Sequence, residues 1–466
     1  MNDVVFREYD IRGIVGQELY IEEVYNLAQA IGHYFLNKNS MVRTIVVGMD
    51  VRTHAPYIKD EVCRSLLDAG FNIIFIGLCT SPILYYAISV LHADAGIMIT
   101  ASHNPKEYNG LKICLGSHMV HGTELQIIRS LYHEHKRILS ASRGTLITHD
   151  ITNYYIDMLY NAFQHLVGSS LPMVFDCANG SAAIVMPALI KRMRWAHAQA
   201  LHAQPDGNFP NHPADPIIEE NMRDVRAAIQ ESHALVGIGF DGDADRMGAM
   251  ASNGILVSGD KLIALFAQSM QAKTGACTVV YDINASAGLP ALLSTWHIPS
   301  IMAPCGHSNI KKYMHKYNAL LGGEISCHFL FKDRSYESDD GIYAAMRLIE
   351  ILHEDPNALI NILVVFPAKI SSPRYRLPCA ESDKNMLVNT VYEYCSNKPE
   401  LTMLTIDGVR IATQSGWGLV RSSNTQAMLC FSFEADTLQE LQKIQRIVAD
   451  ALASVYSYNL YTIFGL

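Results

Sequence analysis

Three carboxylates stand at alternate positions within one short stretch of this 466-residue chain, F-D-G-D-A-D-R. The carboxylates are those of Asp241, Asp243 and Asp245. Negative charges packed so closely repel one another, and a hard divalent cation such as Mg²⁺ among their oxygens would relieve that repulsion. The alternative is an acidic, solvated turn, because turns are rich in Asp and Gly. An EF-hand is excluded, since the positions that need Gly and Glu hold Arg246 and Ser252.

A candidate nucleophile lies in a second stretch, T-A-S-H-N-P, which follows an apolar run. Ser102 presents its hydroxyl among turn-forming residues, although a capping or turn serine is the ordinary alternative. His103 cannot be assumed to activate it, because neighbouring residues of an extended turn point in different directions. No G-x-S-x-G motif surrounds this serine, which argues against a hydrolase triad.

A third stretch, R-S-S-N-T, is dense in hydrogen-bond donors. Arg421 offers a planar fork, and the polar side chains of Ser423, Asn424 and Thr425 add further groups, a combination suited to a dianionic phosphate. A solvated polar hairpin is the competing interpretation. The chain has no Walker motif, so a P-loop nucleotide site is excluded.

A fourth stretch, G-G-E-I-S-C-H, is suited to sugar hydroxyls, because Glu324 and Ser326 are two residues apart and can share one face of an extended loop. An ordinary Gly-rich loop is the alternative. Upstream, His307 offers an imidazole that can exchange protons near neutral pH, although a lone histidine is more often structural.

The elements that position these stretches follow an α/β pattern. Short β-branched runs alternate with amphipathic, helical segments, and in open parallel sheets ligands bind beyond the carboxyl ends of the strands. After the Pro-bearing stretch 366–378, a strand over 428–433 and a helix from Thr437 indicate a smaller α+β domain. The strand-like runs cover 44–48, 72–77, 95–99, 172–176 and 277–282, and a further apolar run over 234–239 directly precedes the three carboxylates.

Composition restricts the class of protein. The chain is 49% hydrophobic and 17% charged, as in soluble globular proteins, and its length predicts several domains. Its formal net charge of -9 argues against nucleic acid as a partner. The ten cysteines form no C-x-x-C pair, and neither a signal-peptide core nor a long apolar run occurs. We therefore expect a cytoplasmic protein without a membrane partner.

Taken together and in this order, the four stretches resemble the α-D-phosphohexomutases, most closely the bacterial phosphomannomutase/phosphoglucomutase branch. Segments 6–13, 102–112, 205–211 and 339–343 match as well, so the resemblance covers nearly the whole chain. It implies an α/β fold with three related α/β domains plus a C-terminal α+β domain around a central cleft. The expected domains are 1–150 with the phosphoserine loop, 151–255 with the metal-binding loop, 256–366 with the sugar-recognition loop, and 367–466 with the phosphate-binding loop.

The resemblance also implies a reaction. A phosphorylated serine gives its phosphoryl group to a hexose monophosphate, mannose or glucose, and the resulting 1,6-bisphosphate turns around and returns the other group. Mg²⁺ is the expected cofactor, a hexose 1,6-bisphosphate the activator, and a monomer or small homo-oligomer the assembly.

The implied site residues have four roles, with Lys112 an alternative to His307 as general acid/base. The catalytic group is Ser102, His307, Lys112 and Arg246; the metal ligands are Ser102, Asp241, Asp243 and Asp245; the sugar and cleft residues are Tyr9, Arg12, Glu324, Ser326 and His328; the phosphate ligands are Arg421, Ser423, Asn424 and Thr425.

The chain departs from the usual pattern of the branch at a few positions. Asn284 replaces a lysine, so a cationic contact is missing, and we expect a weakened or shifted substrate preference that Asn284→Lys reverses by raising kcat/KM. Cys327 replaces a glycine and would be strained if that position needs a positive φ. Cys305 replaces threonine, and Gln426-Ala427 replaces Glu-Pro.

Three alternatives stay open at this point. One is a phosphoglucosamine mutase, another is a non-catalytic sugar-phosphate-binding homologue, and the third is a phosphatase that uses the acidic loop. Phosphate on Ser102 after incubation with a sugar bisphosphate would separate a mutase from a binder.

Overall fold

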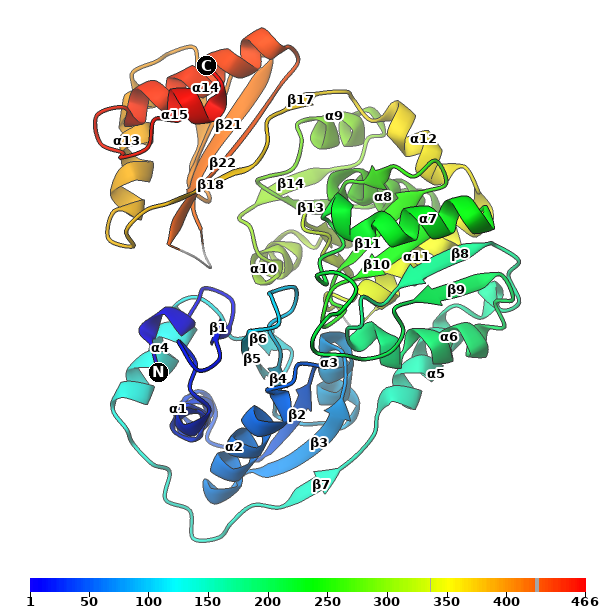
Figure 1. The fold of residues 1–466 in the computed structure, drawn as a ribbon, viewed down its shortest axis with the longest axis vertical. Coiled ribbons are helices and arrows are strands. Elements are labelled where there is room, and N and C mark those ends of the chain that lie inside the picture. Colours follow the sequence, from blue (N-terminus) through cyan, green and yellow to red (C-terminus); the bar gives the residue numbers. More distant parts are fainter. Residues whose placement is uncertain (336, 424–426) are drawn as a thin grey trace. The chain divides into compact units, whose positions relative to one another are not determined.

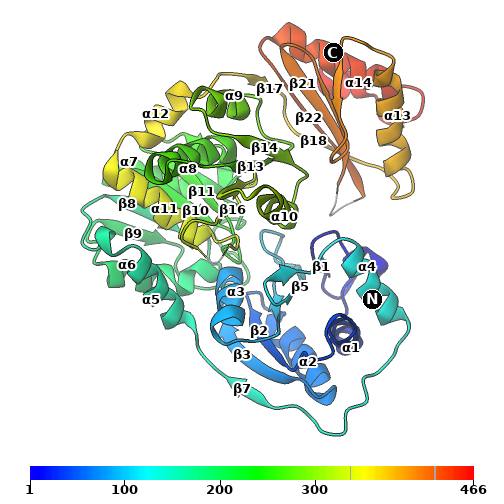
Figure 2. The same cartoon turned by 180° about the vertical axis from the view of Figure 1, so that it is seen from behind.

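The computed structural model describes residues 1–335, 337–423 and 427–466. These residues form two compact units, shown from opposite sides in Figures 1 and 2. Unit 1 comprises Met1–Gly259 and Ser326–Asn361, and unit 2 comprises Asp260–Ile325 and Ile362–Leu466.

The N-terminal part of unit 1 is a mixed sheet with helices on both faces. The strand order is β1-β5-β4-β2-β3-β7, with β6 paired to β5; β4 is parallel to β2 and antiparallel to β5. The elements are η1 (Asp3–Val5), β1 (Ile11–Ile14), α1 (Ile21–Lys38), β2 (Thr44–Met49), α2 (Ala55–Asp68), β3 (Asn72–Leu78), α3 (Ser81–Val90), β4 (Ala95–Ile99), β5 (Tyr108–Leu115), β6 (His118–Met119), α4 (Thr123–His133) and β7 (Leu146–Thr148).

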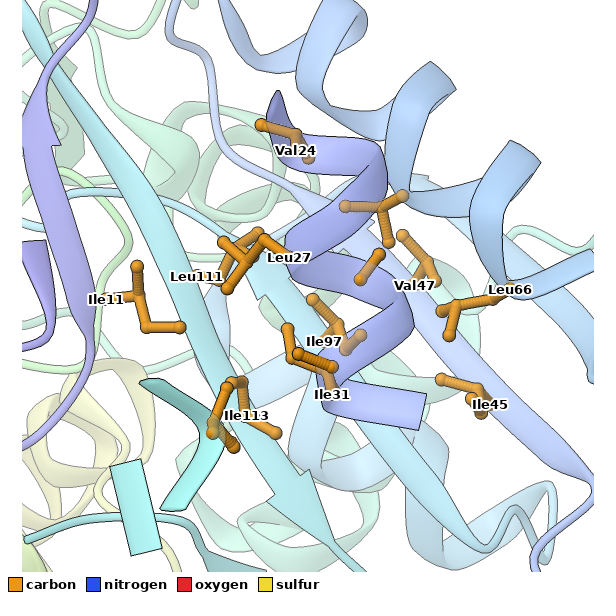
Figure 3. Close-up of a cluster of buried hydrophobic side chains, with 14 of the residues drawn as sticks. Ile11, Val24, Leu27, Ile31, Ile45, Val47, Leu66, Ile97, Leu111 and Ile113 are labelled. Atoms are coloured by element: carbon orange, nitrogen blue, oxygen red, sulfur yellow. The ribbon is translucent and has the colours of Figure 1, made fainter. Parts of the chain in front are cut away.

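The core of this sheet explains why its strands are apolar on both faces. Figure 3 shows Val24, Leu27 and Ile31 of α1 packed against Ile97 of β4 and its neighbours, all fully or almost fully buried. On the opposite face α3 packs so closely that a Cβ on Gly96 would lie 2.4 Å from Ile88 Cδ1. Burial on both faces produces the continuous apolar run that predicts a central strand.

The second sheet of unit 1 has the order β12-β11-β10-β8-β9, with β10 parallel to β8 and antiparallel to β11. All of β10 is buried, and residues 241–246 connect it to its antiparallel neighbour β11. The elements of this part are α5 (Thr152–Ala162), η2 (Gln164–Leu166), β8 (Met173–Asp176), η3 (Ser181–Ile184), α6 (Met186–Met193), β9 (Ala198–Leu201), η4 (Glu219–Met222), α7 (Arg223–Ser232), β10 (Val236–Phe240), β11 (Met247–Ala251) and β12 (Leu256–Val257). Unit 1 also contains α11 (Gly341–Glu354) and β16 (Phe329–Phe331), a strand that is not part of this sheet.

Unit 2 joins a parallel sheet to an antiparallel one. Strands β14 and β15 flank β13 in parallel, and the second sheet has the order β17-β22-β21-β20-β19 with β18 also paired to β22. The elements are α8 (Gly259–Thr274), β13 (Val279–Asp282), α9 (Gly288–Thr295), β14 (Ser300–Ala303), α10 (His307–Tyr317), β15 (Leu321–Gly323), α12 (Ala358–Val365), β17 (Ile370–Ser371), β18 (Tyr375–Pro378), α13 (Lys384–Ser396), β19 (Thr402–Leu404), β20 (Val409–Ala412), β21 (Gly416–Ser422), β22 (Met428–Ala435), α14 (Leu438–Leu452) and α15 (Leu460–Phe464).

The predicted strands lie where their runs indicated, within a few residues. The final helix begins directly after its N-cap, Thr437, whose side chain accepts a hydrogen bond from Glu440 N at 3.2 Å. The domain limits at 150, 255 and 366 stay predictions. Within the described residues, no helix has the length and apolar character needed to cross a membrane.

Candidate active site

Ser102 lies directly beyond the carboxyl end of β4, in the left-handed region with φ of 49°. Its amide donates to Thr100 Oγ1 at 2.9 Å, and the Thr100 hydroxyl donates to Asp50 Oδ2 at 2.7 Å. The serine side chain therefore stands on a turn that is fixed from below by two successive hydrogen bonds.

Arg52 holds the rest of this loop. Its buried guanidinium pairs with Asp50 at 3.1 Å and donates to the carbonyl oxygens of Ser102 at 2.7 Å and Asn104 at 2.6 Å. It also donates to the carbonyl oxygens of Pro105 and Tyr108 at 2.6 and 2.9 Å. A planar fork that satisfies several carbonyls at once fixes the loop conformation in a way that a lysine could not.

The acidic loop occupies the matching position in the second sheet, directly beyond β10. Asp241, Asp243 and Asp245 are all buried, with at most 1% of each residue exposed. Gly242 allows this loop to approach the serine loop, because a Cβ at that position would lie 2.4 Å from Ser102 O. The glycine between the first two aspartates is therefore required by the packing of one loop on the other.

The two loops meet at the serine hydroxyl, which donates to Asp241 Oδ2 at 2.6 Å. A further hydroxyl, that of Ser81 in the first turn of α3, donates to Asp243 Oδ2 at 2.5 Å. The Ser81 amide also donates to the Asp243 carbonyl oxygen at 2.9 Å. The amino end of α3 is thus directed at the acidic loop, where its dipole favours negative charge.

Lys112 of β5 supplies positive charge to the same loop. Its ammonium lies 2.6 Å from Asp243 Oδ2 and also contacts Asp245. Burial would lower the pKa of Lys112, but the charges of Asp243 and Asp245 outweigh that effect and raise it. Lys112 therefore carries its proton throughout the physiological range.

The carboxylates titrate unequally. Burial and the charges of Asp245 and Asp243 raise the pKa of Asp241 well above its usual value. Burial acts in the same direction on Asp245, but Lys112 and His328 outweigh it and hold its pKa well below the ordinary value. Lys112 and the nearby guanidinium of Arg246 supply two fixed positive charges to three buried carboxylates, so a net negative charge remains.

The acidic loop fits a hard divalent cation. One oxygen from each of Asp241, Asp243 and Asp245 lies within 4.8 Å of the others. The buried Oδ1 of Asp243 has no hydrogen-bond partner within the described residues. An orphaned buried carboxylate oxygen is costly unless a cation binds it, and oxygen ligands are those that Mg²⁺ prefers.

Arg246 follows the acidic loop and links it to the serine loop. Its Nε lies 3.6 Å from Asp241 Oδ2, and one of its terminal nitrogens contacts His103 Nδ1. His103 Nδ1 is also 3.3 Å from Ser102 Oγ. Burial and the neighbouring guanidinium lower the pKa of His103 well below its ordinary value, so this imidazole is neutral.

Arg12 and Tyr9 approach from the N-terminal segment. Arg12 of β1 pairs with Asp10 and donates to Asn104 Oδ1 at 2.6 Å, which attaches it to the serine loop. Tyr9 lies in the bend before β1 and is partly buried.

Residues 326–328, where the chain re-enters unit 1, contact the acidic loop. His328 Nε2 lies 3.4 Å from Asp245 Oδ1, and its Nδ1 is 3.1 Å from Ser326 Oγ. Cys327 has φ of 67°, so the condition under which we expect strain at this position is confirmed. Its carbonyl accepts from Met247 N at 3.3 Å, which places this stretch beside the start of β11.

Unit 2 contains a second cluster of buried carboxylates, those of Glu324 and Asp282. Glu324 Oε1 accepts from Gly306 N at 2.6 Å, next to His307, the first residue of α10. Asp282, at the carboxyl end of β13, accepts from Ile325 N at 2.7 Å. Burial, and then the charge of Glu324, raise the pKa of Asp282 to about 6.

Arg421 is anchored by an acidic partner. Its Nε lies 3.2 Å from Asp407 Oδ2, and that oxygen also accepts from Cys305 N at 3.0 Å. Asn284 Nδ2 donates to Cys305 Sγ at 2.6 Å, so two of the positions that depart from the branch pattern contact each other.

Other predicted phosphate ligands continue from β21. Ser423 lies just beyond the strand, and its amide donates to Met428 O at 2.9 Å. Asn424 and Thr425 lie outside the described residues.

The structure thus brings many of the predicted residues together within unit 1, namely Ser102, Lys112, Asp241, Asp243, Asp245, Arg246 and His328, with Arg12 joined through Asn104. Unit 2 holds Glu324, His307, Arg421 and Ser423.

The sequence interpretation missed the residues that support the serine. Asp50 and Arg52 follow β2, which pairs with β4, so the rule that strand ends carry chemistry could have identified them. Ser81 gives no such signal, because its contact with Asp243 joins residues 162 positions apart.

Comparisons with known proteins cover most of the chain. Four family descriptions match: "Phosphoglucomutase/phosphomannomutase, alpha/beta/alpha domain I" over residues 3–137, domain II over 153–254, domain III over 258–367, and the C-terminal domain over 376–451. These matches confirm the predicted fold class of three α/β domains and a C-terminal α+β domain.

Curated relatives and solved structures agree with them. A phosphomannomutase/phosphoglucomutase of Pseudomonas putida is 36% identical over 458 residues, 97% of this chain and 96% of the relative. A phosphoglucomutase of Neisseria gonorrhoeae is 33% identical, with 95% of each chain covered. The crystal structure of a phosphoglucomutase/phosphomannomutase family protein of Burkholderia thailandensis has a TM-score of 0.88 at 28% identity and covers 97% of this chain and 98% of that one. The chain therefore belongs to the phosphoglucomutase/phosphomannomutase family and is a phosphohexomutase, an intramolecular phosphotransferase.

Proposed function

We propose that Ser102 is the phosphoryl carrier of this mutase and that its substrates are the 1-phosphates and 6-phosphates of mannose and glucose. The observation that carries the proposal is the 2.6 Å hydrogen bond from Ser102 Oγ to Asp241, within a buried cluster of carboxylates. Such a cluster suits a centre where phosphoryl oxygens and a cation share one site.

The proposed reaction has two transfers that balance. In the first, the bond from phosphorus to Ser102 Oγ breaks and a bond forms to a free hydroxyl of the hexose monophosphate, whose proton passes to a general base. The product is a hexose 1,6-bisphosphate. In the second, the other phosphoryl group moves to Ser102 Oγ and a proton returns to the sugar oxygen that it leaves. The enzyme is restored and only the position of phosphate on the sugar has changed.

Asp241, Asp243 and Asp245 would hold Mg²⁺ together with the phosphoseryl oxygen. When bound, the ion would neutralise charge on the oxygens of the transferring group. The unpartnered Oδ1 of Asp243 supports this assignment.

Lys112 and Arg246 would act by electrostatics. The raised pKa of Lys112 disfavours it as a proton acceptor and supports a role as a fixed positive charge beside the transferring group. That leaves His307 as the proposed general acid/base, and it is buried at the start of α10 near Glu324.

The residues that would bind the substrate are proposed from the family resemblance and from their local contacts. Glu324, Ser326 and His328 would bind sugar hydroxyls, and Tyr9 and Arg12 would line the site. Arg421 and Ser423, with Asn424 and Thr425, would bind the phosphate that is not being transferred. The Asp407 contact orients Arg421, and orientation of a charged fork is what phosphate binding requires.

Specificity for mannose and glucose is supported by the relatives, which carry the names phosphomannomutase and phosphoglucomutase. A phosphoglucosamine mutase is the alternative. Asn284 stands where the branch usually has a lysine, and its side-chain amide donates to Cys305 Sγ. An amide that is held in this way cannot replace the charge of a lysine, which supports a changed substrate preference.

A coupled assay on mannose 1-phosphate, glucose 1-phosphate and glucosamine 1-phosphate tests the proposal, with and without EDTA and glucose 1,6-bisphosphate. We expect activity on the first two sugars, stimulation by the bisphosphate and loss on chelation, restored by Mg²⁺.

Intact mass should show one phosphoryl group on the wild type and none on Ser102→Ala. Ser130→Ala, an exposed serine of α4, serves as the matched control. Unchanged turnover in Ser102→Ala would refute the serine carrier, and sedimentation of the same samples would test the expected monomer or small homo-oligomer.

A further inference from the structure

A group of histidines and aspartates lies in unit 1 outside the residues assigned to the transfer reaction. Asp176 is the last residue of β8, and His202 directly follows β9, the strand paired with β8 in parallel. Strands β8 and β9 lie side by side (Figures 1 and 2), and Asp176 pairs with Leu201, so Asp176 and His202 stand at the same edge of the sheet. His212 comes from the following loop, and Asp224 is the second residue of α7.

The side chains of this group are within reach of a single ion. One ligand atom each from Asp176, His202 and His212 lies within 4.8 Å of the others. The two imidazole rings are 5.2 Å apart between centroids and nearly perpendicular, at 76°. Asp176 is 1% exposed, whereas the side chains of His212 and His202 are 10% and 17% exposed, which leaves an approach from solvent.

Both ring nitrogens of His212 face oxygen acceptors. Its Nδ1 lies 2.9 Å from Pro213 O, and because a carbonyl oxygen only accepts, that nitrogen carries a proton. Its Nε2 lies 2.9 Å from Asp176 Oδ2, also an acceptor. In a neutral imidazole with its proton on Nδ1, the lone pair of Nε2 would face the carboxylate oxygen of Asp176. Either a second proton on Nε2 or a metal ion bound by both atoms would relieve this repulsion.

The second histidine has the support that metal-binding histidines usually have. His202 Nε2 is 3.0 Å from Asp224 Oδ2, so a carboxylate engages one ring nitrogen and leaves the other for a metal ion. Asp176 is likewise oriented, since its Oδ1 accepts from Ala178 N at 2.8 Å. A carbonyl or carboxylate on one nitrogen of each histidine fixes the orientation of the ring.

We propose that Asp176, His202 and His212 form a second metal site, specific for a transition ion such as Zn²⁺ and distinct from the oxygen-only acidic loop. Two imidazoles and a carboxylate are a common zinc donor set, with a fourth position left for water, whereas Mg²⁺ prefers oxygen ligands. The carboxylates of Asp176 and Asp224 match the charge of a divalent ion beside neutral imidazoles.

The site would fix a loop that reaches the transfer centre. The chain after His202 includes residues 205–216, which contain His212 and Asp215, and Asp215 Oδ1 lies 3.9 Å from an Arg246 nitrogen. In the same loop, the ring of Phe209 packs against Arg52, whose guanidinium carbon lies 5.2 Å from the centroid of that ring. An ion at His212 would therefore tie this loop to the end of β8.

Zn²⁺ binding to the full-length protein tests the site with a readout other than activity. The background is Asp243→Asn, which weakens the acidic loop as a competing zinc site. Calorimetric titration with Zn²⁺ should give one site, and His202→Ala in that background should bind at least about 100-fold more weakly because a direct ligand is lost. Asp224→Asn should weaken binding by about 10- to 100-fold, as loss of an outer partner of a ligating histidine does. His197→Ala, an exposed histidine just before β9, is the matched control and should bind as the background does.

Hydrogen exchange of the amides in 205–216 gives a second measurement. Zn²⁺ should slow this exchange in the His197→Ala protein and leave it unchanged in His202→Ala, with both variants folded by circular dichroism. The proposal is overturned if the background protein binds no Zn²⁺, or if His202→Ala binds it as tightly as His197→Ala.

Discussion

The charges at the transfer centre are set by individual residues rather than by the fold as a whole. Three carboxylates are buried there, and Lys112 is the lysine that pairs with two of them. Burial penalises every one of these charges, so each is tolerated only because an opposite charge lies beside it. The same balance explains why Lys112 keeps its proton and why a further cation fits.

Replacing Lys112 with methionine tests this balance. Removing one partner leaves buried carboxylates uncompensated, so Lys112→Met should lose about 3 kcal/mol of unfolding free energy in EDTA, with part of the loss recovered in Mg²⁺. Turnover should fall about 10²- to 10³-fold, since a charge directed at the transferring group is lost. Urea unfolding and the coupled assay measure the two effects.

Lys38→Met is the control for this change. Lys38 pairs with Glu124 at 3.3 Å with 43% of its side chain exposed, so its removal should cost no more than about 1 kcal/mol. Equal losses in the two variants would contradict the role given to Lys112.

Asp282 gives a pH dependence whose sign follows from its pKa. The folded-state pKa is raised to about 6, so this group binds a proton in the folded protein that it releases on unfolding at intermediate pH. Its contribution to stability is therefore fully present below the pKa of an ordinary aspartate and is lost as pH rises through about 6.

Asp282→Asn should remove that loss. Between pH 4.5 and 7 the unfolding free energy of the wild type should fall by about 2 kcal/mol relative to the variant. Asp436→Asn, an exposed aspartate of the same unit, should leave the wild-type pH profile unchanged. Parallel profiles for the wild type and Asp282→Asn would show that the raised pKa does not govern stability.

At the scale of elements, the centre depends on two loops that follow strands of different sheets. The serine loop follows β4 and the acidic loop follows β10, and each is tied to its own sheet. They approach each other because Gly242 has no side chain and because α3 directs Ser81 at Asp243. The distance between the loops is therefore set by backbone contact.

Gly242→Ala tests the approach of the loops. The new Cβ would lie 2.4 Å from Ser102 O, so the loops must separate. A displacement of about 1 Å at a reacting group costs about 100-fold in rate, and we expect a loss of that size in kcat. Thermal unfolding should change little by comparison.

Gly275→Ala controls for backbone strain, because Gly275 lies at an exposed bend with φ of 73° and has open space around its Cβ position. If that variant loses as much kcat as Gly242→Ala, the contact between the loops is not what limits catalysis.

At the scale of the whole molecule, unit 2 is held together by a buried arginine that joins its two sheets. Arg410 of β20 donates to Ile283 O at 2.5 Å, beyond β13, and its guanidinium lies 3.9 Å from the Trp417 ring centroid. Glu434 accepts from both Trp417 Nε1 and Ala287 N at 2.9 Å. Burial lowers the pKa of Arg410 to about 10, which still leaves it charged at neutral pH.

Arg410→Met should destabilise unit 2 by about 3 kcal/mol, because carbonyl oxygens lose a charged donor in a buried setting. Arg410→Lys should recover only part of this, since an ammonium cannot stack on the indole as a planar fork does. Limited proteolysis between residues 366 and 369 should be faster in both variants. Arg376→Met, an exposed arginine of β18, should match the wild type, and equal cleavage of all proteins would contradict the proposed link.

The sequence alone determined the class of fold and the chemistry of the centre. Strands buried on both faces have continuous apolar runs, so β4 and β10 could be predicted from the sequence. The residues that follow these strands were candidate site residues, because ligands bind beyond the carboxyl ends of strands. Ser102, Asp241, Asp243 and Asp245 are contiguous with those signals, which is why local pattern was enough to find them.

Only the tertiary structure decided which charges meet and what supports them. Arg52 below the serine loop, Ser81 on Asp243 and the His212–Asp176 pair join residues that are distant in sequence, and no local period predicts such contacts. The same holds for Lys112, whose pKa depends on carboxylates more than 130 positions away. Burial and proximity set these properties, and both arise only when the sheets pack.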